Sequence, residues 1–231
     1  DGSTPDEGIL PVIKKDLQNS GQFRVQTPGL LSQKPTSVLQ IDYAYWRKQG
    51  VNDVLVGKVK PIGGDRYEVS FTLISVFNNT KESVLLNQSF TVNHSVLRRF
   101  AHHISDLVYK KLTVVRGIFS TKIVYVLVER PIGNNQKFTL EVADADGFNP
   151  QALLVSSQPI VSPTWSPDGR KLAYVSFEGH HAAIYIQDIA TGKRQLVSRL
   201  PGINSAPAFS PDGTKLALVL TLTGNPNVYV L

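Results

Sequence analysis

The spacing of apolar residues in the first half of the chain is typical of amphipathic helices. Apolar positions recur every three to four residues over 5–20 and again over 95–112, which predicts two helices that each bury one face. Pro11 interrupts the first of these patterns and predicts a late start or a kink there. A shorter helix is expected over 42–49, because Gly50 follows it as a stop signal.

The longest of these helices has recognisable signals at both ends. Asn93 or Ser95 is expected to cap its start, since both side chains can accept hydrogen bonds from free backbone N–H groups. Val96 and Ile104 are expected to point toward a core. The basic residue Lys110 lies near the carboxyl end, where the helix dipole favours a positive charge.

Between the helices the pattern changes to that of strands. A short apolar run fills 53–59, and apolar and polar residues alternate over 66–76 and 84–92. The glycine-rich segment 63–65 suits a hairpin turn between the first two strands. We therefore expect residues 1–116 to form a small α/β domain, a mixed sheet with helices on one face.

The second half of the chain contains a repeat. The segment SPTWSPDGRKLAYV begins at Ser162, and APAFSPDGTKLALV begins 44 residues later at Ala206. A period of about 40–50 residues is that of β-propeller blades. In each copy an aromatic residue precedes Ser-Pro-Asp-Gly, a sequence that favours a tight turn between two strands. Trp165, Phe209, Asp168 and Asp212 are accordingly expected to be blade core and turn residues.

The repeat divides the second half into all-β propeller blades. We expect a degenerate blade over 117–160, a full blade over 161–204 and an incomplete blade over 205–231. The degenerate blade has no Ser-Pro-Asp-Gly strand ahead of it, as in propellers whose distant carboxyl terminus supplies the missing strand. Because a closed propeller needs about 4–8 blades, residues 117–231 are expected to be part of a propeller that stops short of closure.

Composition narrows the range of functions. The sequence contains no Cys, which excludes disulfides, thiolate metal sites and a Cys nucleophile. The net charge of +6 is compatible with a nucleic-acid partner, but Lys and Arg are dispersed and lack the interleaved aromatic residues of a base-stacking platform. A solvated basic surface is therefore preferred, without nucleic-acid binding. Direct membrane insertion is not expected, since no apolar run approaches the ~20 residues that a spanning helix needs.

Residues that could carry chemistry are few. His102 and His103 lie near Asp106 on one expected helix, but no third metal ligand is apparent, so a surface helix is preferred. The pair His180-His181 is interpreted as part of a blade turn. The segment 144–147 resembles the start of a calcium loop, but it lacks the Glu that such a loop requires and fits a hairpin turn better. No nucleophile elbow, P-loop or dinucleotide fingerprint occurs, so catalytic, cofactor-binding and metal-binding residues are not expected.

The order of these elements resembles the TolB family, periplasmic proteins of the Tol–Pal system in Gram-negative bacteria. The resemblance rests on the two blade motifs, on DLQNSGQF at 16–23 and on DVLVGKV at 53–59. It implies a non-catalytic scaffold whose six-bladed propeller binds the lipoprotein Pal and whose extended N-terminus binds TolA. It also implies a part in outer-membrane integrity, in cell division and in colicin import, with contacts to other outer-membrane proteins. Relative to the family, the TolA-binding tail, the first sheet strand and most of the propeller are expected to be missing.

The expected partner surface lies where the chain enters the innermost strand of each blade. A protein that docks over the mouth of the propeller would meet six residues there: Pro159, Ser162, Ile203, Asn204, Ser205 and Ala206. The alternative is that these residues only form turns, with the following prolines setting the start of each strand. A second alternative concerns the whole protein, because prolyl-oligopeptidase-like serine peptidases carry similar blades and hold their catalytic domain elsewhere in the chain.

Overall fold

The computed structural model describes residues 8–26, 33–77, 83–130 and 136–231. The chain forms two compact units, residues 1–121 and residues 122–231, which are described separately. The first unit therefore extends beyond residue 116, because the segment that follows its last helix stays bound to that helix. The carboxylate of Asp106 accepts hydrogen bonds from the backbone N–H groups of Phe119, at 2.7 Å, and Ser120, at 3.2 Å.

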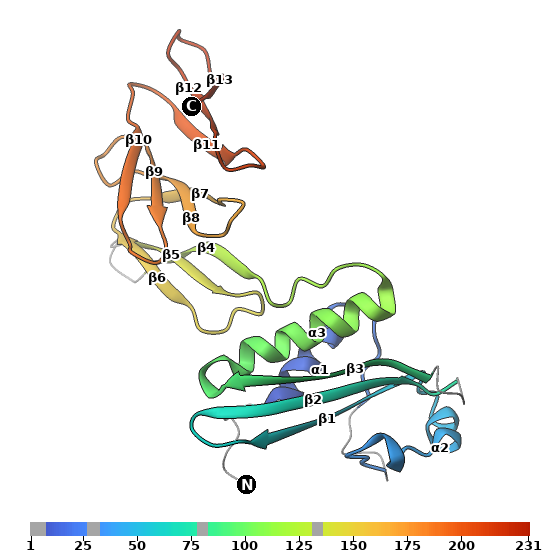
Figure 1. The fold of residues 1–231 in the computed structure, drawn as a ribbon. Helices are drawn as coiled ribbons and strands as arrows, with labels where there is room; N and C mark the ends of the chain where they lie inside the picture. The colour runs from blue at the N-terminus through green and yellow to red at the C-terminus, as the bar shows by residue number, and fades with distance from the viewer. Residues whose placement is uncertain (1–7, 27–32, 78–82, 131–135) are drawn as a thin grey trace. The chain divides into compact units, whose positions relative to one another are not determined.

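The first unit combines helices with one sheet (Figure 1). Its described elements are α1 (Ile9–Asn19), α2 (Tyr43–Lys48), β1 (Asp53–Pro61), β2 (Arg66–Ser75), β3 (Val84–Asn93) and α3 (Leu97–Thr113), with short 3-10 turns at Val38–Gln40 and His94–Val96. The sheet has the order β1-β2-β3, and both pairings are antiparallel. Each strand pairs with the one next to it in the chain, so within the described residues the sheet is antiparallel. A mixed sheet was expected.

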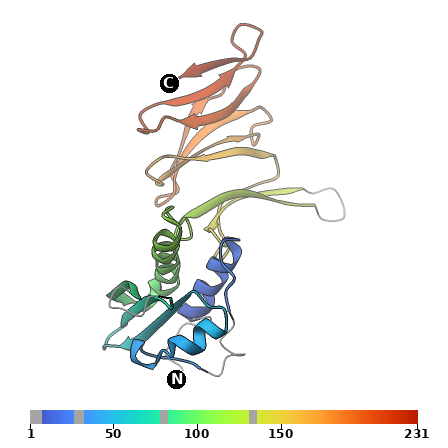
Figure 2. The same ribbon diagram turned by 90° about the vertical axis from the view of Figure 1, so that its right-hand side faces the viewer.

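Two helices cover one face of this sheet. Figures 1 and 2 show α1 and α3 side by side on it, as expected. The core between them and the sheet contains Val12, Leu17, Phe71, Ile104 and Val108. The short helix α2 differs, because Trp46 packs with Val54, Val56 and Ile74 in a separate cluster. These strand residues alternate with those that face α1 and α3, so α2 covers part of the opposite face.

The helix ends depart from expectation in instructive ways. Helix α1 begins at Ile9, so Pro11 lies in its first turn, where its missing N–H group costs least; residues 5–7 of the expected helix lie outside the described part. Helix α3 begins at Leu97 after a 3-10 turn, and neither Asn93 nor Ser95 caps it with a side chain. The extra turn also rotates Val96 away from the core, where we had expected it, and leaves that side chain 40% exposed.

The second unit consists of three antiparallel sheets that follow one another along the chain (Figure 2). Their strands are β4 (Lys122–Glu129), β5 (Lys137–Asp144) and β6 (Gln151–Ser156); β7 (Ile160–Trp165), β8 (Lys171–Ser176), β9 (Ala183–Asp188) and β10 (Arg194–Ser198); and β11 (Asn204–Phe209), β12 (Leu216–Leu220) and β13 (Asn227–Val230). The all-β propeller architecture expected from the repeat is confirmed. The first sheet has three described strands, which correspond to the second to fourth strands of the next blade.

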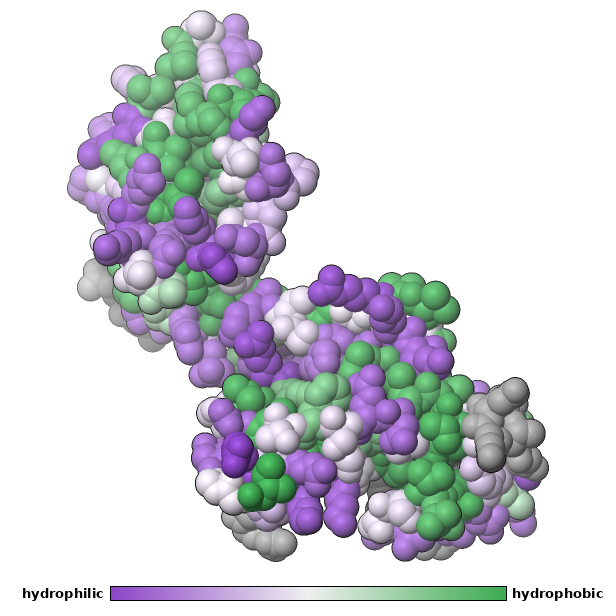
Figure 3. All heavy atoms as spheres, in the orientation of Figure 1, coloured by the Kyte–Doolittle hydropathy of each residue, from purple (hydrophilic) through white to green (hydrophobic). Residues whose placement is uncertain are grey.

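Apolar side chains join neighbouring blades. Leu140 and Ile160 lie in one buried cluster with Tyr174, which joins the first two sheets. Ile184 and Leu218 lie in a second cluster that joins the last two. The last strand is less covered: Val228 and Val230 are 71% and 61% exposed, and Figure 3 shows apolar side chains between polar ones over β11–β13.

None of the helices in the described ranges is long and apolar enough to cross a membrane.

Candidate functional site

The six expected contact residues lie at or near one end of the propeller sheets, which we call the mouth end. In the described chain it comprises residues 129–130, 136–137, 156–160, 177–182, 198–204 and 221–226, which connect strands or flank such connections. Strand register brings these connections to the same end, because Ile160 pairs with Ser176 and Asn204 pairs with Leu220. Hydrogen bonds reinforce it: the N–H group of Phe177 donates to the carbonyl of Pro159 at 3.0 Å.

Two of the expected contact residues share an unusual backbone conformation just inside this end. Ser162 has a φ of 53° and Ala206 a φ of 49°, in the left-handed region that non-glycine residues seldom occupy. Each begins a β-bulge, because two residues of the inner strand lie opposite one residue of its neighbour. Pro163 and Pro207 fill the second bulge position, where no ladder N–H group is required. Both bulge residues are exposed.

The structure gives Asn204 a different part from the one expected of a contact residue. It is 1% exposed and lies inside the connection between β10 and β11. Its Oδ1 accepts hydrogen bonds from the Ser198 hydroxyl at 2.7 Å and the Leu200 N–H group at 3.1 Å, and its Nδ2 donates to the Leu200 carbonyl at 2.7 Å. Asn204 therefore fixes the shape of the connection from within and offers a partner no surface.

The remaining expected residues are accessible to different degrees. Ile203 is 43% exposed, and its N–H group donates to the Thr221 hydroxyl at 2.8 Å, which ties the connection to the turn after β12. Pro159 and Ser205 are half-buried. The structure thus brings Ile203, Ser205 and Ala206 together at the start of β11, and Pro159 and Ser162 at the equivalent place in the preceding blade.

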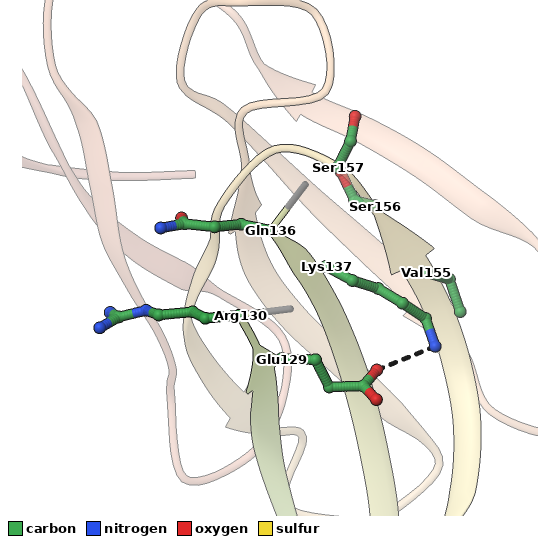
Figure 4. Close-up of a pocket in the computed structure, with 7 residues that line it drawn as sticks. All are labelled: Glu129, Arg130, Gln136, Lys137, Val155, Ser156 and Ser157. Carbon is green, nitrogen blue, oxygen red and sulfur yellow. Dashed lines mark ion pairs between the residues drawn. The ribbon is translucent and has the colours of Figure 1, made fainter. Parts of the chain in front are cut away.

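An open hollow lies at the mouth end of the first sheet. It has a volume of about 630 Å³ and is lined by Glu129, Arg130, Gln136, Lys137, Val155, Ser156 and Ser157. Lys137 pairs with Glu129 at 2.9 Å. Figure 4 shows the Arg130 and Gln136 side chains extending to the same side of the hairpin, away from that ion pair. These residues could not be singled out from the sequence, because nothing in their local pattern distinguishes them from ordinary turn residues.

A second charged cluster lies beside the turn between β8 and β9. Arg194 binds Glu178 through two hydrogen bonds, of 2.7 and 3.2 Å, and its guanidinium lies 4.2 Å from the ring centroid of Tyr185. The hydrogen bond from Arg194 holds the pKa of Glu178 below its usual value. Burial raises the pKa of Tyr174 to about 12. Its hydroxyl donates to Gln187 at 2.8 Å. Tyr174 is therefore a neutral structural residue at physiological pH, and a catalytic acid or base is not indicated here.

The opposite end of the blades carries the Ser-Pro-Asp-Gly turns. The Ser166 hydroxyl donates to Asp168 at 2.6 Å, and the Arg170 N–H group donates to the same carboxylate oxygen at 3.0 Å. Ser210 and Asp212 repeat this arrangement in the last blade. The hydrogen bond from Ser210 lowers the pKa of Asp212 to about 2. These aspartates are turn residues, as expected.

The candidate metal ligands do not converge. No group of three or more His, Asp or Glu residues suited to a metal ion occurs among the described residues. His102 and Asp106 share a helix, but Asp106 binds the segment after α3, as described above. The segment 144–147 forms the expected hairpin turn, closed by a hydrogen bond from the Gly147 N–H group to the Asp144 carbonyl. His180 and His181 are exposed in the turn between β8 and β9.

The surface position expected for His102 is wrong. Its side chain is 2% exposed, and its Nδ1 lies 2.8 Å from the Oδ2 of Asp16, which is itself 4% exposed. The Ser105 hydroxyl donates to the same oxygen at 2.7 Å. This buried network joins α1 to α3. It was missed because its members are 86 and 89 residues apart, and no local pattern relates them.

Comparison with known proteins agrees with this architecture. The TolB beta propeller domain model matches residues 109–231, and the TolB amino-terminal domain model matches residues 1–82. The Tol-Pal system protein TolB of Coxiella burnetii is 66% identical over 202 residues, which cover 87% of this chain and 46% of that protein. The protein of the same name in Legionella pneumophila (strain Paris) is 49% identical over 197 residues, covering 84% of this chain and 44% of that one.

A solved structure is similar over nearly the whole chain. The crystal structure of TolB from Acinetobacter baumannii superimposes with a TM-score of 0.88 at 37% sequence identity, and the match covers 99% of this chain and 56% of that one. The chain spans about half the length of the curated relatives it matches. The propeller match alone covers more than half of the present chain. With both units matched in the same order, the chain belongs to the TolB family.

Proposed function

We propose that the full-length protein is a non-catalytic scaffold of the Tol–Pal system in the periplasm of a Gram-negative bacterium. Its propeller binds the lipoprotein Pal at the mouth end, and an N-terminal tail of the full-length protein binds TolA. Through these two contacts it supports outer-membrane integrity and cell division, and colicins use the same surface for import. The names of the curated relatives support a place in the Tol–Pal system.

One observation carries the choice of surface. Ser162 and Ala206 repeat a left-handed bulge at equivalent points of two blades, and both are exposed at the start of an inner strand. A non-glycine residue in this region costs about 1–3 kcal/mol, and such strain concentrates at functional sites. Beside the second bulge, Ile203 exposes an apolar side chain on a connection whose shape Asn204 fixes. A preformed apolar contact of this kind favours protein docking, because little order is lost on binding.

The test is the affinity of the full-length protein for Pal of the same organism, measured by calorimetry. Ile203→Asp and Ser162→Asp each place a negative charge on the proposed surface and are expected to weaken binding at least tenfold. Thr214→Asp is the control, since Thr214 is exposed in a turn at the opposite end. Unchanged affinity in both mouth-end variants would move the surface elsewhere, and no affinity of the natural protein for Pal would refute the function.

The peptidase alternative receives no specific support. Residues 1–82 match the TolB amino-terminal domain model, and the present sequence contains no Gly-x-Ser-x-Gly elbow. A Gly-x-Ser-x-Gly elbow followed by Asp and His elsewhere in the full-length sequence would revive it.

A further inference from the structure

Charge is distributed unequally between the two ends of the propeller blades. Residues 122–231 contain eight Asp and Glu residues, and only Glu129 and Glu178 belong to the mouth end. Both are already used in ion pairs, with Lys137 and Arg194. The acidic turn residues, Asp144, Asp146, Asp168, Asp188 and Asp212, all lie at the opposite end. The described part of the mouth end therefore has no acidic side chain left over.

Two guanidinium groups at the mouth end, by contrast, have no acidic partner within the described residues. Arg130 and Gln136 are among the residues that line the hollow of the first sheet, and Figure 4 shows their side chains extending to the same side. Both side chains end in N–H donors, and together they present the kind of donor set that a carboxylate accepts. The adjacent Lys137 and Glu129 neutralise each other, so the positive charge of Arg130 is not cancelled locally.

Arg199 occupies the corresponding end of the next blade. Its guanidinium lies over the turn between β8 and β9, where a Cβ atom placed on Gly179 would be 2.8 Å from Nη2. The absence of a side chain at Gly179 thus makes room for the cation. The same turn exposes His180 and His181, whose rings add further hydrogen-bond donors beside it. His180 has a φ of 63°, so the backbone at this turn is also held in a left-handed conformation.

We propose that the mouth end recognises an acidic segment of the partner, with carboxylates bound by Arg130 and Gln136 on the first sheet and by Arg199 on the second. The identity of the partner as Pal rests on the proposed function. The preference for carboxylates rests only on the side chains of Arg130, Gln136 and Arg199. Charged groups arranged in this way accelerate association and exclude partners of the wrong sign more than they add to affinity. The exposed Ile203 side chain then adds an apolar contact to these charged ones.

The first experiment measures association of the full-length protein with Pal by stopped-flow at about 50 and 300 mM salt, where screening differs strongly. Arg130→Glu and Arg199→Glu are each expected to slow association about tenfold at low salt and to flatten its salt dependence. Lys193→Glu makes the same charge change in an exposed turn at the opposite end and is expected to alter the rate less than twofold. Gly179→Ala keeps the charge but displaces the Arg199 guanidinium, and it is expected to slow association by an intermediate factor.

A second arm separates this proposal from the proposed function. Fluorescence anisotropy compares an extended twelve-residue peptide rich in Asp and Glu with its Asn and Gln counterpart. The acidic peptide alone is expected to bind, and Arg130→Glu with Arg199→Glu is expected to abolish that binding. If Pal fails to bind but this discrimination holds, the function is refuted and the acidic-segment proposal stands. If Pal binds the two Arg variants and Lys193→Glu equally well, the acidic-segment proposal is overturned and the function stands.

Discussion

Ser162 and Ala206 occupy the same point of two successive blades and share one backbone conformation, with φ values of 53° and 49°. Each lies at the first position of a bulge and precedes a proline. Glycine is the usual residue at such a position, because it alone reaches positive φ without a steric cost. The repeat therefore preserves a strained geometry as well as a sequence.

This strain gives a first prediction, about stability. Ala206→Ile is expected to destabilise the protein by about 1–2 kcal/mol, because a β-branched residue tolerates the left-handed region poorly. Ala208→Ile is the control, since Ala208 is exposed in the same strand with ordinary backbone angles, and its effect should stay within about 0.5 kcal/mol. Ala206→Gly should leave stability unchanged or raise it slightly. Urea unfolding measures all three, and equal losses in the two Ile variants would contradict the strain argument.

The buried network of the first unit gives a second prediction. Asp16→Ala removes the acceptor of both Ser105 and His102, and is expected to cost about 3–5 kcal/mol of unfolding free energy, as breaking a buried polar pair usually does. Gln18→Ala, an exposed change in the same helix, should cost less than about 0.5 kcal/mol. Denaturant titration followed by circular dichroism distinguishes them. A loss below about 1 kcal/mol for Asp16→Ala would mean that the network adds little to the packing of α1 on α3.

A third prediction concerns the dependence of stability on pH, which follows from the turn residues Asp168 and Asp212. The hydrogen bond from Ser210 lowers the pKa of Asp212 in the folded chain from its ordinary value of 3.8 to about 2. A group whose pKa is lowered by folding contributes stability above its unfolded pKa and loses that contribution as the pH falls through the folded value. Asp168 shifts in the same direction. The urea concentration at the midpoint of unfolding should therefore decrease as the pH is lowered from about 4 to about 2.

A double variant isolates the contribution of these turns. Asp168→Asn with Asp212→Asn should lower stability near neutral pH and flatten the profile between pH 4 and pH 2, since neither turn can then be protonated. The matched change Asp65→Asn, in an exposed hairpin of the first unit, should leave the profile as it was. A profile that is equally steep in the double variant would assign the acid sensitivity to other groups.

The segment after α3 gives a fourth prediction. Asp106 binds Phe119 and Ser120, and a Cβ atom at Gly117 would lie 2.6 Å from the Cα atom of Asp106, so the backbone approaches the helix closely there. Asp106→Ala and Gly117→Ala are both expected to loosen this segment and to accelerate trypsin cleavage after Arg116 several-fold. Arg99→Ala, an exposed change in the same helix, is the control. Cleavage at the natural rate in both variants would show that other contacts hold the segment.

Much of the fold could be predicted because its signals are local. The Ser-Pro-Asp-Gly turns use only residues within about six positions of each other, and the 44-residue spacing identified the blades. The hairpin between β1 and β2 likewise has its glycines where the turn requires positive φ. Such elements can be recognised without knowing what packs on them.

Other features could not be predicted, for two reasons. Some side chains bind residues that are distant in the sequence, and some polar side chains are buried although their type suggests exposure. His102 looked like a surface residue because its acceptor, Asp16, is 86 positions away. Asn204 was expected to be an accessible turn residue. Its side chain instead accepts hydrogen bonds from Ser198 and Leu200 and is buried inside the connection between β10 and β11. The hollow at Arg130 arises where two strand ends meet, and its charge asymmetry is apparent only once every nearby acidic side chain is found to be paired.

The hydrogen bonds of each Ser-Pro-Asp-Gly turn also bear on how such a protein can evolve. The hydroxyl of Ser166, the carboxylate of Asp168 and the backbone groups they bind all belong to one short segment, and Ser210 with Asp212 repeats them without borrowing an atom from the earlier copy. A duplicated gene segment therefore encodes all the residues whose hydrogen bonds form its turn. Blades can be added or lost by duplication and deletion, and each new copy can diverge at its mouth end while its turn remains intact.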